Sequence, residues 1–468
     1  PETVSTDFDL ADRLYFEPIT FEDIMNIIEF EKPDGVLVQF GGQTPLKIAE
    51  QLTNEGVKIF GTSSASIDLA ENREAFASII KKLKIQIPEY CIAKNYEEII
   101  NFSEIAQFPV LVRPSYVLGG RAMQIVYNKE QLVDYVFRSA EATNDHPILI
   151  DQFIENAFEF DVDALSDGEE VFVAGIMQHI EEAGVHSGDS SCVLPPYDMS
   201  SKVKKDIIDM TTKLALELNV IGLINLQFAV KDNEVYVLEV NPRSSRTVPF
   251  VSKYSNVPLA NIAAQLSVGR KISDFNLNEN RFKHTAVKKA VLPFKKFKDE
   301  KVFLGPEMKS TGEVMGIDTE PGIAFLKAMQ SDGYTVPRSG TAFVSITDVD
   351  KKRALPIIKD LQKLNFTIIA TKGTAEFLLE NNINCSPVFK VGEGRPNVVD
   401  EILNDNIHLV INTPQGAQSR YDEEAIGKTS VMKNVLTITT LAGAKAAIEA
   451  MSNMNKIRVA PLQEYFKQ

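Results

Sequence analysis

Residues 223–246 read LINLQFAVKDNEVYVLEVNPRSSR, two apolar runs joined by a polar turn. Similar short runs recur from residue 108 onward, among them PILIDQFI, FEFDVDAL and EVFVAGIMQHI. Such runs, bounded by turn residues, are typical of antiparallel strands. Helical periodicity over residues 129–142 and 201–218 interrupts the runs. This region is therefore predicted to be an α+β unit in which helices pack on a sheet.

The first 85 residues have a different pattern. The apolar run GVLVQF at 35–40 ends in two glycines and precedes a helical stretch at 45–52. A short strand at 57–60 and a helix at 64–83 follow. This order predicts a partial α/β layer that lacks its first strand.

After residue 335 the pattern becomes regular again. The strands FVSIT, FTIIAT, SPVFKV, IHLVINT and VLTITT alternate with helical stretches such as 351–364, which predicts a doubly wound parallel sheet. Acidic residues are in excess before residue 335, whereas the remainder is nearly neutral. The segment between the two regular regions is expected to be irregular. The predicted parts are residues 1–85, 86–272, 273–334 and 335–468.

Composition excludes several classes of protein. The chain has 468 residues and a net charge of −15, from 49 Lys and Arg against 64 Asp and Glu. A broad basic surface for nucleic acid is therefore not expected. Cys91, Cys192 and Cys385 are scattered, which indicates neither a disulfide framework nor a zinc site and favours the cytoplasm. Neither a membrane span nor a signal peptide is recognised, and a start at Pro1 without Met indicates a fragment.

The strand at 236–241 carries the first candidate site. Because strand side chains alternate, Glu239, Asn241 and Arg243 are expected on one face, with Leu238 and Val240 toward the core. A carboxylate and an amide oxygen suit a hard cation such as Mg²⁺. An edge strand with a polar solvent face is the alternative explanation.

The neighbouring residues extend this edge. Arg243 and Arg246 are able to hold an anionic substrate bidentately. On the preceding strand, Gln227 lies opposite Glu239 if the turn at 232–234 has three residues. A two-residue turn would place Gln227 on the other face.

Two further segments are weaker candidates. In VRPSYVLGGRAM, at 112–123, Arg113 and Arg121 bracket two glycines, but neither the P-loop nor the Rossmann pattern is present. A structural hairpin explains this loop as well. In HIEEAGVHSGDSS, His186 is able to contact a nucleotide, while His179 is equally well explained as a strand histidine.

The C-terminal region offers an anion site. Thr371, Thr374, Lys390 and Asn412 fall at or just after the carboxyl ends of three predicted parallel strands, where ligands of open α/β sheets bind. Hydroxyls, a helix N-terminus and a lysine suit a phosphate. Ordinary N-capping by threonine is the alternative.

Taken in order, several motifs resemble one family. RPSYVLGGRAM, DVDA, AGVHSGDSS, NLQFAV, EVNPRSSRTVPFVSK and LGPEMKSTGEVMG are similar to the carbamoyl-phosphate half of carbamoyl phosphate synthetase large subunits, as are PETVSTDFDLADRLYFEP and VQFGGQTPLKIAE. The resemblance implies an α/β and α+β architecture: an ATP-grasp domain at 86–272 after a partial α/β layer, then a methylglyoxal-synthase-like, doubly wound regulatory domain from residue 335.

The resemblance also implies an activity. The family is an ATP-dependent ligase that makes carbamoyl phosphate from glutamine or ammonia, bicarbonate and two ATP, for pyrimidine and arginine biosynthesis. This half would phosphorylate carbamate with the second ATP. The implied partners are a glutamine amidotransferase small subunit and the N-terminal half of the same subunit. UMP or a related nucleotide is the implied effector.

Residue roles follow from the same resemblance, with Arg243 and Arg246 holding carbamate and the transferring phosphoryl group. The implied nucleotide-pocket residues are Arg113, Gln152, Ile154, Glu159, Gly184, Val185, His186, Ser187, Gln227 and Glu239. The implied Mg²⁺ or Mn²⁺ ligands are Gln227, Glu239 and Asn241, a set that selects the three-residue turn. The implied effector residues are Lys351, Thr371, Thr374, Lys390 and Asn412.

Three positions depart from the family pattern. Gln152 replaces a basic residue of many members, and Pro414 replaces a hydroxyl residue near the effector. Lys289 stands where ornithine-responsive members have an acidic residue, while Glu181 and Asp189 match the other residues of that site. A lysine there would repel a cationic amino acid, so no ornithine response is expected. The alternative functions are another ATP-grasp carboxylate–amine ligase and a catalytically silent nucleotide-binding regulatory module.

Overall fold

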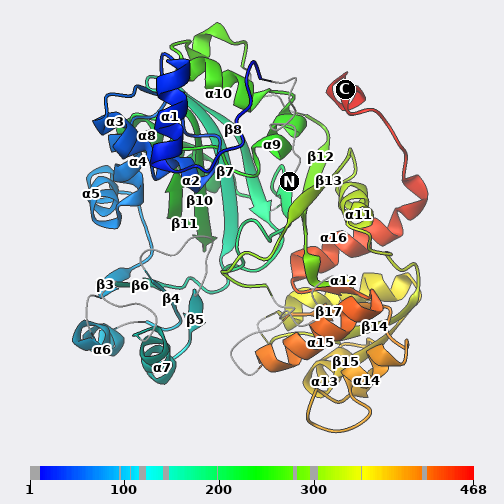
Figure 1. Ribbon diagram of the computed structural model, residues 1–468. Coiled ribbons are helices and arrows are strands. Elements are labelled where there is room, and N and C mark those ends of the chain that lie inside the picture. Colours follow the sequence, from blue (N-terminus) through cyan, green and yellow to red (C-terminus); the bar gives the residue numbers. More distant parts are fainter. Residues whose placement is uncertain are drawn as a thin grey trace.

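The structure is a computed structural model in which a central body carries two smaller lobes (Figure 1). It describes residues 11–93, 96–105, 107–114, 123–140, 147–197, 199–277, 282–295, 304–348, 350–413 and 419–467. The loop that contains Arg121, and Pro414, lie outside the described residues. In the described parts of the chain, no helix has the length and apolar character needed to cross a membrane.

The N-terminal layer is a two-stranded parallel sheet with helices around it. Its elements are α1 (Phe21–Glu31), β1 (Val36–Leu37), α2 (Gln43–Leu46), α3 (Ala49–Asn54), β2 (Ile59–Phe60), α4 (Ser64–Glu71) and α5 (Arg73–Leu83). The single helix predicted at 64–83 is wrong. It is divided at Asn72, whose side chain accepts hydrogen bonds from the backbone N–H groups of Glu74 and Ala75 and so begins a second helix.

The first small lobe is an antiparallel sheet with the strand order β3-β6-β4-β5. Its elements are β3 (Tyr90–Ala93), α6 (Tyr96–Ile105), β4 (Val110–Pro114), β5 (Gln124–Val126), α7 (Lys129–Ala140) and β6 (Ile148–Gln152). A core of its own, which includes Val110, Val112 and Ile150, lies between this sheet and its helices. In Figure 1 the lobe lies below the body.

The body is a seven-stranded sheet with the order β11-β10-β7-β8-β9-β12-β13. Its strands are β7 (Phe158–Asp167), β8 (Val171–His179), β9 (Cys192–Leu194), β10 (Ile221–Lys231), β11 (Glu234–Asn241), β12 (Thr285–Val291) and β13 (Gly312–Asp318). Helix α8 (Ser201–Glu217) covers one face together with α5, and α9 (Val248–Ser255) and α10 (Leu259–Ser267) cover the other. This arrangement confirms the α+β prediction.

The segment 273–334 is more regular than expected. Strands β12 and β13 extend the body sheet, with Val287 paired to Gly316, and α11 (Pro321–Ser331) packs against β13. These strands were missed because apolar, charged and small residues mix without a clear period of two. Sheet pairing, which is not local in sequence, fixes them.

The C-terminal lobe has the five parallel strands that were predicted, and their order is β16-β15-β14-β17-β18. Its elements are β14 (Gly340–Ser345), α12 (Lys351–Lys363), β15 (Phe366–Thr371), α13 (Lys372–Glu380), β16 (Ser386–Val388), α14 (Val398–Leu403), β17 (Leu409–Asn412), α15 (Ser419–Lys433), β18 (Leu436–Ile438) and α16 (Leu441–Ser452). Val344 and Phe343 belong to separate cores on opposite faces of the sheet. The sheet is therefore doubly wound.

Candidate functional site

The β10–β11 hairpin positions Gln227 and Glu239 opposite each other, but its turn differs from the predicted one. Its turn has only two residues, Asp232 and Asn233, both with positive φ (52° and 64°), as in a type I′ turn. The predicted three-residue turn is therefore wrong. A β-bulge restores the expected pairing, because Gln227 pairs with Glu239 while the next residue of β10 pairs with Val237.

The extra residue of this bulge is Leu238. It is only partly buried and lines the same cavity as Glu239, so the prediction that it faces the core is wrong. Val237 and Val240 face the core instead, with 1% and 5% of their surface exposed. One inserted residue shifts the alternation of side chains on one side of the bulge relative to the other.

Glu239, Asn241 and Arg243 lie along one wall of this cavity. One guanidinium nitrogen of Arg243 donates to Asn241 Oδ1 at 3.0 Å, and another donates to the carbonyl oxygen of Ser244 at 3.0 Å. Burial lowers the pKa of Arg243, and Glu239 opposes that shift. Arg243 Nε is buried and has no hydrogen-bond partner among the described residues. An unpaired N–H on such a wall suits a phosphate oxygen.

The loop from Ala183 to Gly188 forms another wall. The Gly184 N–H donates to Glu159 Oε1 at 2.9 Å, and Gln227 Nε2 donates to Ser187 Oγ at 2.7 Å. Burial lowers the pKa of His186, so this imidazole is neutral near pH 7. Its Nδ1 accepts from the Gly188 N–H at 3.0 Å. The first two of these bonds connect the loop to Glu159 on β7 and to Gln227 on β10.

Arg113 comes from the small lobe. Its guanidinium lies 3.5 Å from Asp151 on β6, and the same carboxylate contacts Arg73 of α5. Asp151 therefore links the lobe to the N-terminal layer through Arg73, and it also contacts Arg113 within the lobe. Arg113 Nε, like Arg243 Nε, is buried without a hydrogen-bond partner among the described residues.

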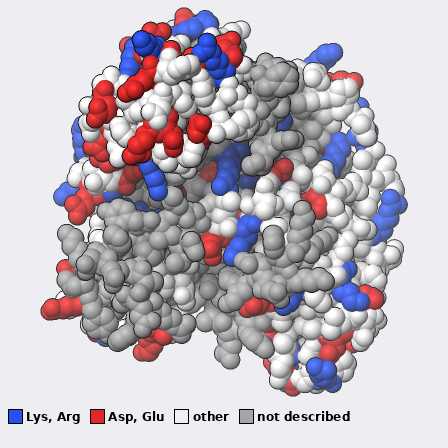
Figure 2. Space-filling view, in the orientation of Figure 1, with Lys and Arg blue, Asp and Glu red and all other residues white. Residues whose placement is uncertain are grey.

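One cavity of about 860 Å³ brings together every residue predicted for the nucleotide, the metal and the anionic substrate. These residues are Arg113, Gln152, Ile154, Glu159, Gly184, Val185, His186, Ser187, Gln227, Glu239, Asn241, Arg243 and Arg246. Figure 2 shows basic side chains in the hollow below the N-terminal layer, which contains α1, α3 and α4. The outer surface of this layer is rich in acidic side chains. Among the described residues, the cavity lining has five Arg and Lys side chains against four Asp and Glu, so it lacks the acidic excess of a chain with net charge −15.

Arg73, Asp161 and Lys288 also line this cavity, although the sequence did not predict them as site residues. Asp161 and Asp163 alternate in β7 with the apolar residues Phe160, Val162 and Ala164, and all five are buried. Charged side chains inside a buried strand cost free energy unless they are paired. Two aspartates in DVDA were therefore the signal from which Asp161 could have been identified as a site residue.

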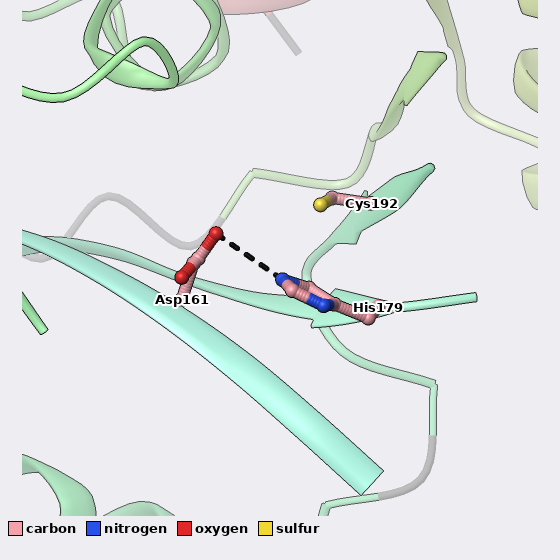
Figure 3. A group of neighbouring side chains, drawn as sticks. All are labelled: Asp161, His179 and Cys192. Carbon is pink, nitrogen blue, oxygen red and sulfur yellow. Dashed lines mark hydrogen bonds and ion pairs between the residues drawn. The ribbon is translucent and has the colours of Figure 1, made fainter. Parts of the chain in front are cut away.

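Asp161, His179 and Cys192 form a buried cluster beside the cavity (Figure 3). His179 Nε2 lies 3.1 Å from Asp161 Oδ2, and His179 Nδ1 lies 3.3 Å from Glu159 Oε2. Burial alone would lower the pKa of His179, but Cys192 and Asp161 raise it well above its ordinary value. Both ring nitrogens of His179 face a carboxylate of β7, an arrangement that favours the protonated imidazole, so we interpret the cluster as an internal ion pair and not as a metal centre.

The effector residues predicted in the C-terminal lobe follow neighbouring strands. Lys351 Nζ donates to the carbonyl oxygen of Gly373 at 2.9 Å, and Thr371 Oγ1 donates to Thr374 Oγ1 at 3.2 Å. Asn412 ends β17, next to Ser345 of β14. The exposed Lys390 follows β16. All these strands are parallel, so their carboxyl ends share one edge.

A second cavity, of about 920 Å³, lies between the body and the C-terminal lobe. It is lined by residues of both parts, including Glu181, Lys289 and Thr440, and Asn412 is the one predicted effector residue on its wall. Thr440 Oγ1 donates to the carbonyl oxygen of Ile180 at 2.7 Å, which joins the two parts directly.

Comparison with known sequences covers most of the chain. The profile of the carbamoyl phosphate synthase preATP-grasp domain matches residues 1–69. The profile of the carbamoyl-phosphate synthase L chain, ATP binding domain, matches residues 72–275, and an MGS-like domain profile matches residues 353–439.

Curated relatives are similar over the whole chain. The carbamoyl phosphate synthase large chain of Archaeoglobus fulgidus is 53% identical over 472 residues, which cover 100% of this chain and 44% of that protein. The carbamoyl phosphate synthase large chain, C-terminal section, of Aquifex aeolicus is 50% identical over 98% of this chain and 88% of its own length. The chain thus spans less than half of the longer relative.

Solved structures share the fold at low identity. The biotin carboxylase domain of Hydrogenobacter thermophilus 2-oxoglutarate carboxylase, in complex with MgADP, ADP and bicarbonate, has a TM-score of 0.53 and 17% identity, over 62% of this chain and 67% of that one. Campylobacter jejuni biotin carboxylase, in a β-γ-ATP complex, has a TM-score of 0.51 and 15% identity, over 60% and 64%.

Proposed function

This chain belongs to the carbamoyl phosphate synthase large-chain family, and on that premise we propose that it phosphorylates carbamate with ATP to give carbamoyl phosphate. In this step a carbamate oxygen forms a bond to the γ-phosphorus of ATP. The bond from that phosphorus to the β,γ-bridging oxygen breaks, and ADP leaves with the electron pair. No enzyme nucleophile is needed, because such transfer depends on positioning and on neutralising charge.

One observation supports this proposal above the others: a single cavity is lined by carboxylate and amide oxygens on one strand and by arginines directly after it. Glu239 and Asn241 offer the oxygen ligands that Mg²⁺ or Mn²⁺ prefers, and Gln227 adds an amide oxygen because only its Nε2 is engaged with Ser187. When bound, the cation would neutralise phosphate oxygens of ATP.

The remaining roles divide along the walls of the cavity. We assign Arg113, Gln152, Ile154, Glu159 and the loop of Gly184, Val185, His186 and Ser187 to the nucleotide. Arg243 and Arg246 would hold carbamate and the transferring phosphoryl group, since guanidinium groups bind such anions bidentately. The direct test is ATP formation from ADP and carbamoyl phosphate.

Complete synthesis from glutamine or ammonia, bicarbonate and two ATP would need partners. The chain spans 44% of the Archaeoglobus relative, so the N-terminal half of the subunit would supply the first ATP-dependent step. A glutamine amidotransferase small subunit would supply ammonia, in the cytoplasm, for pyrimidine and arginine biosynthesis. The predicted division at residues 85, 272 and 334 is part of the same proposal.

We also propose a nucleotide effector site at the carboxyl ends of β14 to β17. UMP is expected to raise the thermal midpoint of the chain at millimolar concentration, because only the folded lobe would bind it. Lys390→Ala should remove most of this shift, since it deletes an exposed ammonium at that edge. Differential scanning fluorimetry with and without UMP measures the effect.

The matched control is Lys363→Ala. Lys363 lies at the other end of α12 from Lys351 and contacts Asp360 at 2.7 Å. The wild-type shift should persist in this variant. Equal UMP shifts in the Lys390 and Lys363 variants would count against the assignment of Lys390.

Ornithine is not expected to bind or activate this protein. Lys289 forms an ion pair with Asp332 at 3.4 Å, and both oxygens of Asp189 accept backbone N–H groups, from Lys309 and Ser310, at 2.8 Å. A cationic ligand would meet an ammonium and an occupied carboxylate there. Isothermal titration with ornithine should show no heat of binding, and a saturable isotherm would contradict this expectation.

A further inference from the structure

The segment between β11 and α9 carries both arginines of the proposed site. Arg243 and Arg246 line the cavity, and Arg246 also contacts the sulfur of Met308. Between Asn241 and Val248 the chain has no helix or strand, so sheet and helix hydrogen bonds do not fix the positions of these arginines. Other contacts must hold the segment.

One anchor is Asp163, which is fully buried in β7, a strand inside the body sheet. Its Oδ1 accepts hydrogen bonds from Ser245 Oγ at 2.7 Å and from Asn225 Nδ2 at 2.9 Å. Its Oδ2 accepts from Thr247 Oγ1 at 2.6 Å. The two loop hydroxyls are also within 2.8 Å of each other. Both oxygens of this carboxylate are therefore engaged, and two of the donors belong to the arginine segment.

The second anchor is Gln39, which is 1% exposed in the N-terminal layer. Its side-chain Nε2 donates to the carbonyl oxygen of Pro242 at 2.7 Å. Its backbone carbonyl oxygen accepts from the Ser244 N–H at 2.9 Å. Gln39 thus holds the first half of the segment through backbone atoms, whereas Asp163 holds the second half through hydroxyls.

The hydrogen bond from Thr247 to Asp163 replaces a helix-capping bond that would stabilise α9. Thr247 is the residue before α9, where a threonine hydroxyl usually accepts a hydrogen bond from the helix backbone. Here it makes no capping bond and donates to Asp163 instead. A buried carboxylate is itself unfavourable unless its hydrogen bonds compensate. An apolar contact would serve packing alone, so the network points to a positional role.

We infer that Asp163 is a positioning residue for phosphoryl transfer: through the hydroxyls of Ser245 and Thr247 it sets where Arg243 and Arg246 stand in the cavity. Asp163 itself does not line the cavity. The inference rests on the proposed function, because it assigns these arginines to the reacting phosphoryl group.

The experiment removes the hydroxyls and leaves Asp163 and both arginines in place. In the combined Ser245→Ala and Thr247→Val variant, kcat for ATP formation from ADP and carbamoyl phosphate should fall by roughly 10- to 100-fold, because small displacements of positioning groups are costly. KM for ADP should stay near the wild-type value, since no predicted nucleotide-pocket residue is changed. Loss of the fold would also lower the apparent kcat at an unchanged KM, so the rate is expressed per mole of folded protein, with the folded fraction measured by circular dichroism.

Two further variants separate positioning from structure. Thr247→Ser keeps the hydroxyl and should restore most of the activity that Thr247→Val loses. Thr212→Val is the matched control, because in the described part of the chain its hydroxyl donates only to the carbonyl oxygen of Ile208, within α8. Wild-type kcat in the combined variant, or equal losses in Thr247→Ser and Thr247→Val, would overturn the inference.

A readout independent of activity distinguishes this inference from the proposed function. Wild-type protein that forms no ATP would contradict the proposed function. Phenylglyoxal modification of Arg243 and Arg246, mapped by mass spectrometry with and without inorganic phosphate, would still report on positioning. Phosphate should protect both arginines in the wild type and protect them less in the combined variant. The same pattern in both proteins would overturn the role of Asp163.

Discussion

Glu239→Gln is expected to lower ATP formation from ADP and carbamoyl phosphate by at least about 100-fold, the cost typical of removing one electrostatic contact to a transferring group. The substitution keeps the shape of the side chain and removes its negative charge from the edge formed with Gln227 and Asn241. A divalent cation would then lose its one carboxylate ligand at this edge. A coupled luciferase assay with MgADP measures the rate.

The control is Glu234→Gln on the same strand. Glu234 is exposed, begins β11, and contacts Lys202 at 3.4 Å on the surface. Exposed pairs of this kind contribute little to stability, so this variant should keep the wild-type rate. Activity that survives Glu239→Gln would refute the metal assignment. Parallel loss in both variants would indicate a general effect of removing charge from β11.

Gly316→Ala is expected to lower the thermal midpoint of the chain strongly. The glycine lies in β13 opposite Val287, directly beneath α11. An added Cβ would lie 2.0 Å from the carbonyl oxygen of Ala324 and 2.5 Å from the backbone nitrogen of Ala328. These are backbone atoms, so the helix itself must move. Overpacking of this kind costs about 1–3 kcal/mol or more.

The same strand provides a matched control. Among the described residues, no atom lies within 4 Å of a Cβ added at Gly312, so Gly312→Ala should leave the midpoint nearly unchanged. Thermal unfolding followed by circular dichroism compares the two variants. A similar midpoint for both would show that α11 does not press on β13 as the structure describes.

The position of α11 explains why this contact matters. Its buried residues Ala324, Leu326 and Ala328 belong to one core with residues of the C-terminal sheet and of α16. That core also includes Val193 and Val287 of the body sheet. A shift of α11 would therefore disturb the joint between the body and the C-terminal lobe.

Much of the fold could be predicted from local patterns. The five parallel strands of the C-terminal lobe and the antiparallel strands of the body were recognised because apolar runs and turn residues report on local backbone preference. The break at Asn72 was missed because helical periodicity continues across it. Strands β12 and β13 were missed because their pairing partners are distant in sequence.

The chemistry of the candidate site was also largely readable from residue types. Oxygen ligands and arginines within one short segment, Glu239 to Arg246, are enough to predict an edge for a cation and an anion. What could not be predicted was the exact register, since a two-residue turn would have turned Gln227 away. The bulge at Leu238 corrects the register, and only hydrogen bonds between strands define it.

The amino-acid sequence by itself therefore determined the kinds of element, their order and the groups available for catalysis, because these depend on period, turn chemistry and side-chain type. Only the tertiary structure decided which groups meet. It joined Asp163 to Ser245 and Thr247, 82 and 84 residues away, and joined His179 to Asp161 across neighbouring strands. Buried charges need partners, and the sheet supplies them from segments that are distant in the sequence. Such pairing cannot be predicted from any local segment.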